Sequence, residues 1–280
     1  MSPPVRRRTV PPIQHATQMF EDALSIGPPV AIISYSAGKD SAACLQLAIE
    51  ARKRHPALKL AALFWYRVPG IECIEKPLQA TCDRFGLPLY KVPHDLLTGA
   101  LLAGTNRAFT VETNDVPALK MVDLELAGRV RFAAHLSNIS PEKLFGPDGK
   151  LAVRLSDFKI NPFKIWMVYG HRQDESLERR GMLSGFRNQT VELGVKSGGR
   201  LGFDPKFHRI YPLATWNRAG VMAYVRHHRL PLAPTFGRKN QTGLDLGDPE
   251  TLRHLRTHHR SDYDKIVRLF PRVAGLLDQG

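Results

Sequence analysis

The chain has 280 residues, of which 43% are hydrophobic and 24% are charged, a composition typical of a soluble globular protein with one main domain plus additions. The net charge of +14 predicts a surface that attracts polyanions such as DNA or tRNA, although nucleotide phosphates or general solubility account for the same excess. The cysteines, Cys44, Cys73 and Cys82, lack a zinc-ligand spacing, so we expect no disulfide framework, zinc or iron–sulfur cluster. No apolar run has the length of a membrane helix, so we expect no membrane span and a cytoplasmic location.

The chain begins with a segment that is rich in proline and arginine. Residues 1–12 contain Arg6, Arg7 and Arg8 and cannot bury enough apolar surface to order themselves, so we predict a flexible basic arm. The folded domain is predicted to begin near Ile13.

Strands alternate with helices in the first part of the folded domain. The predicted elements are the strand 30–33, the helix around 43–49, the strand 60–65, the helix 71–85 ended by Gly86, and the strand 87–92. This alternation predicts the α/β class, with a doubly wound, mostly parallel sheet flanked by helices.

The pattern weakens between about residues 94 and 161, where glycine and proline interrupt short pieces, and we interpret this stretch as an inserted subdomain. The elements predicted after it are the strand 163–169, the strand 209–213, a helix capped by Thr215, and two helices that start near Asp248 and Ser261. We therefore predict a nucleotide-binding domain over 13–235 and a helical C-terminal extension over 236–280.

The segment from Ser34 to Ser41 lies between the first predicted strand and its helix. A turn of small residues at this position lets backbone N–H groups approach phosphate oxygens, and the helix that follows adds unpaired N–H groups and the positive end of its dipole. Lys39 supplies a cation, and Asp40 either caps the helix or helps to hold Mg²⁺. The Walker spacing is absent, so this is a different phosphate-binding loop.

This segment resembles the signature S-G-G-x-D-S of the PP-loop family, which stands here as Ser36-Ala37-Gly38-Lys39-Asp40-Ser41. The stretch from Gly170 to Arg179 resembles the G-x-R-x-x-E-S-x-x-R segment of the phosphoadenosine phosphosulfate (PAPS) reductase branch, and residues 209–231 resemble a further region of that branch. The resemblance implies a Rossmann-like fold that binds ATP or PAPS with Mg²⁺. Proteins of this type from phages and mobile elements look similar around Phe236, which suggests a role in DNA modification.

The resemblance and the chemistry of the residues together predict the site. Lys39, Asp40 and Arg172 are the expected catalytic residues, with Asp40 as the Mg²⁺ ligand. The expected nucleotide-binding residues are Ser34, Ser36, Ala37, Gly38, Lys39, Asp40, Ser41, Gly170, Arg172, Glu175 and Arg179. Arginines suit phosphate or sulfate oxygens because the planar guanidinium binds two oxygens at once. The alternative for the stretch from Gly170 to Arg179 is a surface helix with ion pairs such as that between Glu175 and Arg179.

The chain departs from the reductases because it has no cysteine after Cys82, whereas they carry a C-terminal nucleophilic cysteine. The first hypothesis is therefore an enzyme that adenylates an acceptor and releases pyrophosphate. The second is binding or reduction of PAPS with a thiol supplied by a partner. The third is a nucleotide-sensing or DNA-binding component without turnover. The sequence leaves the acceptor, the general base and the oligomeric state open, including a homodimer.

Overall fold

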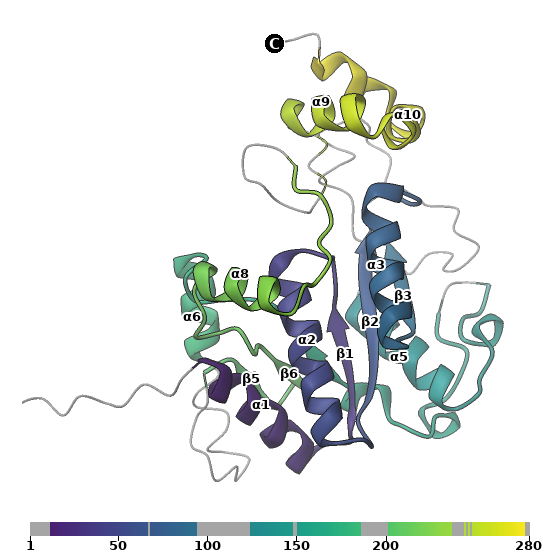
Figure 1. Cartoon of the computed structure of the whole chain (residues 1–280). Helices are drawn as coiled ribbons and strands as arrows, with labels where there is room; N and C mark the ends of the chain where they lie inside the picture. Colours follow the sequence, from purple (N-terminus) through teal and green to yellow (C-terminus); the bar gives the residue numbers. More distant parts are fainter. Residues whose placement is uncertain are drawn as a thin grey trace, which may run out of the picture.

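The computed structural model describes residues 12–66, 68–93, 124–147, 150–185, 201–236, 244, 246 and 248–277. The predicted arm, apart from Pro12, and residues 94–123 of the predicted insertion lie outside the described residues. Figure 1 shows the whole chain with its elements labelled.

A six-stranded sheet forms the centre of the molecule, with the strand order β3-β2-β1-β4-β6-β5 (Figure 1). Its strands are β1 (Val30–Ser34), β2 (Lys59–Tyr66), β3 (Leu89–Pro93), β4 (Trp166–Val168), β5 (Phe203–Asp204) and β6 (Arg209–Ile210). All pairs are parallel except β5 with β6. The predicted α/β class with a mostly parallel sheet is confirmed.

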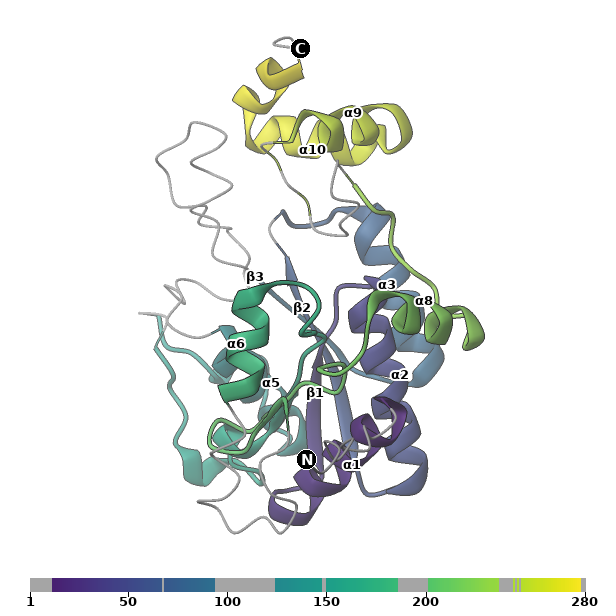
Figure 2. The ribbon, with the colours of Figure 1, turned by 90° about the vertical axis from the view of Figure 1, so that its left-hand side faces the viewer.

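Helices cover both faces of this sheet. The α-helices are α1 (Pro12–Ile26), α2 (Lys39–Arg54), α3 (Glu72–Phe85), α5 (Leu124–Leu136), α6 (Leu177–Gly185), α8 (Arg218–His227), α9 (Pro249–His258) and α10 (Arg260–Leu269). Short 3₁₀ helices are η1 (Pro141–Lys143), η2 (Leu155–Asp157), η3 (Pro162–Lys164) and η5 (Pro271–Leu277). Figure 2 shows α2, α3 and α8 on one side of the sheet and α5 and α6 on the other.

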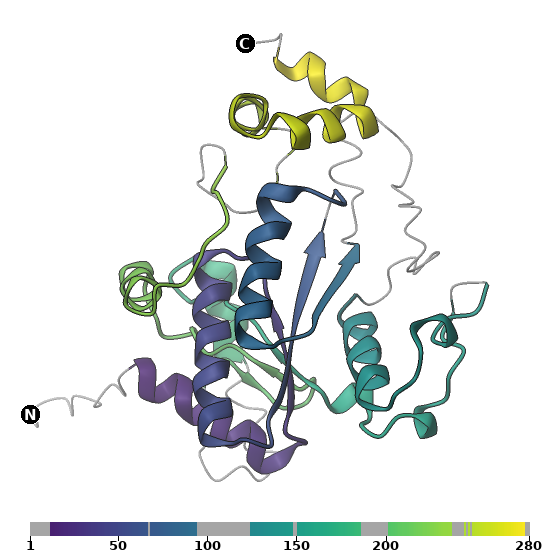
Figure 3. The ribbon, with the colours of Figure 1, turned by 45° about the vertical axis from the view of Figure 1, so that its right-hand side comes forward.

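The alternation of side chains along β1 explains the two layers. Ala31 and Ile33 belong to the core under α1, α2, α3 and α8, whereas Val30 and Ile32 belong to the core under α5. A strand buried on both faces must be apolar throughout, as this one is. Small residues of α2, such as Ala43 and Ala48, are fully buried and let the helix lie close to the sheet. Figure 3 shows α2 and α3 along the same face.

The strand order contains a switch point between β1 and β4. The chain runs outward from β1 to β2 and β3, and then returns to place β4 on the other side of β1. Connections from the two central strands therefore leave in opposite directions, and the loops after their carboxyl ends separate. Ligands of doubly wound folds bind in the crevice that such a switch point creates.

Several boundaries differ from the sequence predictions. The strand predicted over 163–169 is reduced to β4, because Pro162 starts the 3₁₀ helix η3. The helix predicted to be capped by Thr215 starts later, since the side chain of Asn217 accepts a hydrogen bond from the backbone N–H of Gly220 at 2.7 Å. The strand predicted over 209–213 ends at Ile210, and the short antiparallel strand β5 beside it was not predicted.

The C-terminal helices α9 and α10 lie beyond the carboxyl ends of β1 and β2 in Figures 1 and 3. α9 starts at Pro249, as predicted for a helix near Asp248, and the Asp248 side chain caps it by accepting hydrogen bonds from the backbone N–H groups of Glu250 and Thr251. α10 starts at Arg260, one residue before the predicted Ser261. Within the described parts of the chain, no helix combines the length and apolar character needed to cross a bilayer.

Candidate functional site

The loop after β1 turns sharply into α2. Ala37 adopts a left-handed backbone conformation, with φ of 53°, and is fully buried. The PP-loop signature has glycine at this position, and a Cβ makes this conformation unfavourable by about 1 kcal/mol or more. The loop is held from outside by Ala233, whose backbone N–H donates to the carbonyl oxygen of Ala37 at 2.9 Å.

The two serines of the motif close the loop from within. Ser41 Oγ accepts a hydrogen bond from the backbone N–H of Ser36 at 3.1 Å and donates to the carbonyl oxygen of Gly38 at 3.0 Å. The hydroxyl oxygens of Ser36 and Ser41 lie 3.2 Å apart. These contacts define the shape of the turn, and the Ser36 hydroxyl remains partly accessible.

The N-terminus of α2 has the character of an anion site. Gly38 occupies the N-cap position, and no side chain in the described ranges caps the first turn. The backbone N–H groups at the start of an α-helix have no intrahelical partners, and the positive end of the dipole lies there. Lys39 and Asp40 follow directly, and their side chains form an ion pair with 2.7 Å between Nζ and Oδ2.

The loop after β4 faces the start of α2 across the switch point. Gly170 passes so close to Asp40 that a Cβ on it would lie 3.1 Å from both the carbonyl carbon and the Cβ of Asp40. Arg172 follows, with its Nε 2.8 Å from Asp40 Oδ1, an ion pair without the alignment of a hydrogen bond. The two sequence segments that carry the family resemblance therefore lie side by side.

We call Arg172, Asp40, Asp174 and Glu175 the Arg172 cluster. The Arg172 side chain is 5% exposed and also pairs with Asp174, through Nη1, and with Glu175 Oε1, at 3.6 Å from Nη2. Glu175 also accepts a hydrogen bond from the backbone N–H of Arg172. The guanidinium is thus enclosed by three carboxylates.

Arg179 lies at the rim of the same cluster. Its Nε is 3.2 Å from Glu175 Oε2, and its side chain is 37% exposed, so it is the more accessible of the two predicted arginines. The Glu175–Arg179 pair expected for a surface helix is present. It coexists with the Arg172 cluster because Glu175 contacts both arginines.

His171 packs in a stack of aromatic rings beside the cluster. Its ring centroid lies 5.6 Å from that of Tyr169 and 5.5 Å from that of Tyr211, with both rings tilted by less than 30°. Burial, and then the positive charge of Arg179, lower the pKa of His171 to about 4. The imidazole is therefore neutral at pH 7 and serves as a stacked structural ring.

A second group of charges lies behind the site, and we call Glu125, Arg129, Tyr169 and Arg209 the Glu125 cluster. Glu125 Oε2 accepts hydrogen bonds from the Tyr169 hydroxyl at 2.5 Å and from Arg209 Nε at 3.0 Å, while Oε1 pairs with Arg129. Burial, and then the neighbouring Glu125 carboxylate, raise the pKa of Tyr169 well above its usual value. This cluster ties α5 to β4 and β6.

Burial raises the pKa of all three cysteine thiols, of which Cys44 lies in α2 and Cys73 and Cys82 lie in α3. Cys44 is fully buried in α2, and burial raises the pKa of its thiol well above the usual value. Burial, and then Asp262, raise the pKa of Cys73 to about 12, and burial raises that of Cys82 to about 12. A thiol with such a pKa stays protonated at neutral pH.

The structure brings the predicted residues to one edge of the sheet. Ser34 ends β1, residues 36–41 form the loop and the first turn of α2, and residues 170–179 lie opposite them. Sequence reasoning missed Asp174 and Ala233. Asp174 lay inside the segment that carries the resemblance, but no pattern linked Ala233 to the loop. Trp216 lies in the core, and the partly buried Tyr224 packs against it edge to face.

Comparison with solved structures finds proteins of similar fold. A U34-tRNA thiolase, NcsA, from Methanococcus maripaludis, whose structure contains a [4Fe-4S] cluster, is 19% identical, with 94% of this chain and 78% of that chain covered and a TM-score of 0.41. NMN synthetase from Francisella tularensis is 11% identical, with 97% and 94% covered and a TM-score of 0.39. PAPS reductase from Candida auris is 11% identical, with 78% and 81% covered and a TM-score of 0.37.

No family model matches the chain, and no curated protein matches it. The strand order and the helices on both faces of the sheet confirm the predicted Rossmann-like α/β fold.

Proposed function

We propose that the chain binds an adenine nucleotide with its phosphates at the N-terminus of α2. The observation that carries this proposal is the first turn of α2, which no side chain of the described residues caps, at the switch point of the sheet and opposite the segment from Gly170 to Arg179. Three features of an anion site coincide there: free backbone N–H groups, the positive end of a helix dipole and the cations Lys39 and Arg179.

Asp40 is the residue that we assign to Mg²⁺. Its two carboxylate oxygens both face cations, Lys39 at 2.7 Å and Arg172 at 2.8 Å. The Asp40 carboxylate therefore already neutralises positive charge in the structure. Carboxylate oxygens, together with phosphate oxygens, are the ligands that Mg²⁺ prefers. When bound, the ion neutralises charge that develops on the phosphates.

The other charged residues then take separate roles. On nucleotide binding, the Lys39 ammonium leaves its ion pair with Asp40 and pairs with a phosphate oxygen. Arg179 likewise turns from Glu175 toward the phosphates. Arg172 stays enclosed and keeps Asp40 in place, as a positioning residue. Gly170 permits the close approach of the two segments.

The reaction that this arrangement supports best is adenylation. An acceptor hydroxyl oxygen attacks the α-phosphorus of ATP and its proton passes to solvent, the bond from that phosphorus to the bridging oxygen breaks, and pyrophosphate leaves with the electron pair of that bond. Such catalysis depends on in-line positioning and on neutralisation of charge, which the helix N-terminus and the cations supply. His171 is not the base, since its pKa of about 4 makes it a poor proton acceptor at neutral pH.

We further propose a nucleic acid as the acceptor. The net charge of +14 favours a polyanion over a small neutral acceptor. Binding of DNA or tRNA would then weaken steeply as the salt concentration rises, because the neutralised phosphates release their counterions.

Calorimetry tests the proposal. ATP, PAPS and adenosine phosphosulfate are titrated with and without Mg²⁺ into the wild type, Asp40→Ala and the control Asp83→Ala, whose exposed side chain lies on α3. We expect ATP to bind in a Mg²⁺-dependent manner, with about tenfold to 100-fold weaker binding to Asp40→Ala and unchanged binding to the control. Equal binding to all three proteins would remove Asp40 from the site.

Measurement of pyrophosphate release in the presence of DNA and tRNA then tests turnover. Release that depends on one acceptor supports adenylation. Preferential binding of PAPS, with sulfite release when a thiol protein is added, contradicts adenylation in favour of sulfonucleotide chemistry. Tight ATP binding without release on any acceptor contradicts it in favour of nucleotide sensing.

A further inference from the structure

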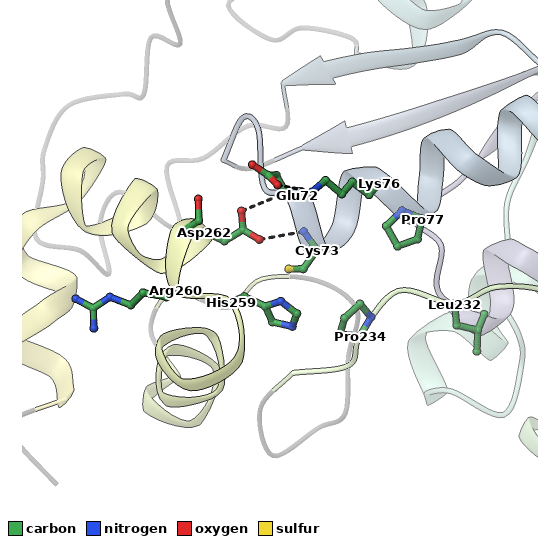
Figure 4. A pocket seen from close by; sticks show the side chains of 10 residues that line it. Glu72, Cys73, Lys76, Pro77, Leu232, Pro234, His259, Arg260 and Asp262 are labelled. Atoms are coloured by element: carbon green, nitrogen blue, oxygen red, sulfur yellow. Dashed lines mark hydrogen bonds and ion pairs between the residues drawn. The ribbon is translucent and has the colours of Figure 1, made fainter.

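Three side chains with different metal-binding atoms meet between α3 and the C-terminal helices (Figure 4). Cys73 lies in the first turn of α3, His259 lies at the junction of α9 and α10, and Asp262 lies in the first turn of α10. One ligand atom from each lies within 4.8 Å of the other two. Neither the phosphate loop nor the Arg172 cluster includes any of them.

We infer that Cys73, His259 and Asp262 bind a zinc ion. A thiolate, an imidazole and a carboxylate together are a ligand set suited to zinc, whereas Mg²⁺ and Ca²⁺ prefer oxygen ligands alone. Zinc lies about 2.0–2.3 Å from such atoms, so the three groups close in by about 1 Å around the ion. The Cys73 proton leaves to solvent as the zinc–sulfur bond forms.

Asp262 is oriented for this role by the backbone of α3. It is 2% exposed, and its oxygens accept hydrogen bonds from the N–H groups of Glu72 at 2.8 Å and Cys73 at 2.9 Å. A carboxylate oxygen has two lone pairs, so these hydrogen bonds leave capacity for a further interaction, and at Oδ1 the Lys265 ammonium also lies 3.8 Å away. Hydrogen bonds of this kind hold metal-binding carboxylates in position.

His259 is held equally firmly by its backbone. Its N–H donates to the carbonyl oxygen of Leu255 at 2.8 Å, and its own carbonyl oxygen accepts from the N–H of Tyr263 at 3.0 Å. The residue thus ends α9 and precedes α10, so its backbone is fixed at the corner between the two helices, and Figure 4 shows its ring near the sulfur of Cys73.

The three residues border a cavity of about 500 Å³, which Lys76, Leu232 and Pro234 also line. Three protein ligands leave one position of a tetrahedral zinc ion free, and the cavity gives a water molecule access to that position. The zinc ion would therefore link α3 to α10 through its protein ligands and bind one exchangeable water molecule.

The same cavity borders the segment that holds the phosphate loop. Ala233, between Leu232 and Pro234, donates its N–H to the carbonyl oxygen of Ala37 in that loop. Zinc would therefore stabilise the C-terminal helices near the edge of the sheet where the loop lies. This inference does not depend on the proposed nucleotide chemistry, and its test uses no nucleotide.

Zinc titration of the tag-free, metal-stripped full chain tests the inference, with a chromophoric chelator as the competitor. We expect one zinc ion per chain and at least about a tenfold loss of affinity in Cys73→Ser and in His259→Gln. The control variants are Cys82→Ala on the same helix and His258→Gln beside His259, and both should bind zinc like the wild type. Circular dichroism of each variant establishes that it is folded.

Cobalt(II) gives a second readout that needs no variant. Binding of cobalt to the wild type should produce the near-ultraviolet charge-transfer absorption of a thiolate–cobalt bond, and zinc should abolish it. Absence of stoichiometric zinc, absence of that absorption, or zinc binding lost in His258→Gln but kept in Cys73→Ser would each overturn the inference.

Discussion

The Arg172 cluster and the Glu125 cluster lie close together along β4 and the residues that follow it, yet they are built in opposite ways. In the first, one arginine is surrounded by three carboxylates, and Lys39 and Arg179 lie partly exposed at its rim. In the second, one carboxylate is surrounded by two arginines and a tyrosine hydroxyl, and Glu125 is 9% exposed.

This difference separates binding from stability. The exposed cations at the rim of the Arg172 cluster can exchange a protein carboxylate for a ligand phosphate at low cost, because solvent screens them in both states. The Glu125 cluster has no such freedom, since a buried charge that loses its counter-charge is strongly destabilising. Substitutions at the rim should therefore change affinity, and substitutions in the Glu125 cluster should change stability.

The largest effect is expected for Glu125→Ala. It leaves the buried guanidinium of Arg129 and the partly exposed guanidinium of Arg209 without their carboxylate, which should lower the free energy of unfolding by about 3 kcal/mol. Urea denaturation measures this loss, and the exposed Glu142→Ala is the control, with an expected change within about 0.5 kcal/mol. Equal stability of the two variants would show that the Glu125 cluster is not the rigid support described above.

His171, which stacks beside both clusters, makes stability depend on pH. In the unfolded chain its pKa is about 6.5, whereas burial keeps it at about 4 in the folded protein. Between these values mainly the unfolded state takes up the proton, so stability falls as the pH decreases from about 6.5 to about 4, by at most about 3 kcal/mol in total.

Comparison of urea denaturation at pH 7 and pH 4.5 in wild type and His171→Phe isolates this contribution, because the phenyl ring keeps the stacking and does not titrate. The loss of stability on acidification should be smaller in His171→Phe. The same loss in both proteins would place the pH dependence elsewhere.

Arg179→Gln tests whether the exposed rim of the Arg172 cluster contributes to nucleotide binding. It removes an accessible cation at the rim and leaves Arg172 and its carboxylates in place, so we expect about tenfold weaker ATP binding and a change in stability below about 0.5 kcal/mol. Calorimetry and thermal unfolding measure the two quantities. Arg180→Gln, an exposed neighbour on α6, should change neither. Unaltered ATP affinity in Arg179→Gln would exclude this residue from phosphate binding.

The smallest effect is expected for Ala37→Gly. Glycine relieves the left-handed strain at φ of 53° but gives the unfolded chain more freedom, so the free energy of unfolding should rise by about 0–1 kcal/mol. Ala42→Gly, inside the first turns of α2, should instead lower it by about 1 kcal/mol. Thermal denaturation of both variants distinguishes the signs. If Ala37→Gly lowered the free energy of unfolding as much as Ala42→Gly does, the loop would not be strained.

The sequence predicted the parts of the fold that depend on local periodicity. The observed bounds of β1, α2, β2 and α3 lie within a few residues of the predicted ranges, because apolar residues recur in each with the period of a strand or of a helix. Gly86, in the left-handed conformation, ends α3 as predicted. The short strands β4, β5 and β6 were harder to predict, since two or three residues carry no periodicity and their pairing depends on the rest of the sheet.

The same limit applies to the site. The loop motif identified residues 36–41, because phosphate binding by backbone N–H groups requires neighbours in sequence. The pairing of Arg172 with Asp40 joins residues far apart in the chain, and so does the meeting of Cys73 with His259 and Asp262. No spacing rule detects such contacts, and for this reason the cysteine pattern alone predicted no zinc site.

The central claim, that the N-terminus of α2 binds nucleotide phosphates, is tested most directly by a crystal structure with Mg²⁺ and a non-hydrolysable ATP analogue. We predict phosphate oxygens within hydrogen-bonding distance of the backbone N–H groups of Lys39, Asp40 and Ser41, with Lys39 turned from Asp40 to the phosphates. A bound analogue whose phosphates lie elsewhere, with the Lys39–Asp40 pair intact, would contradict the claim.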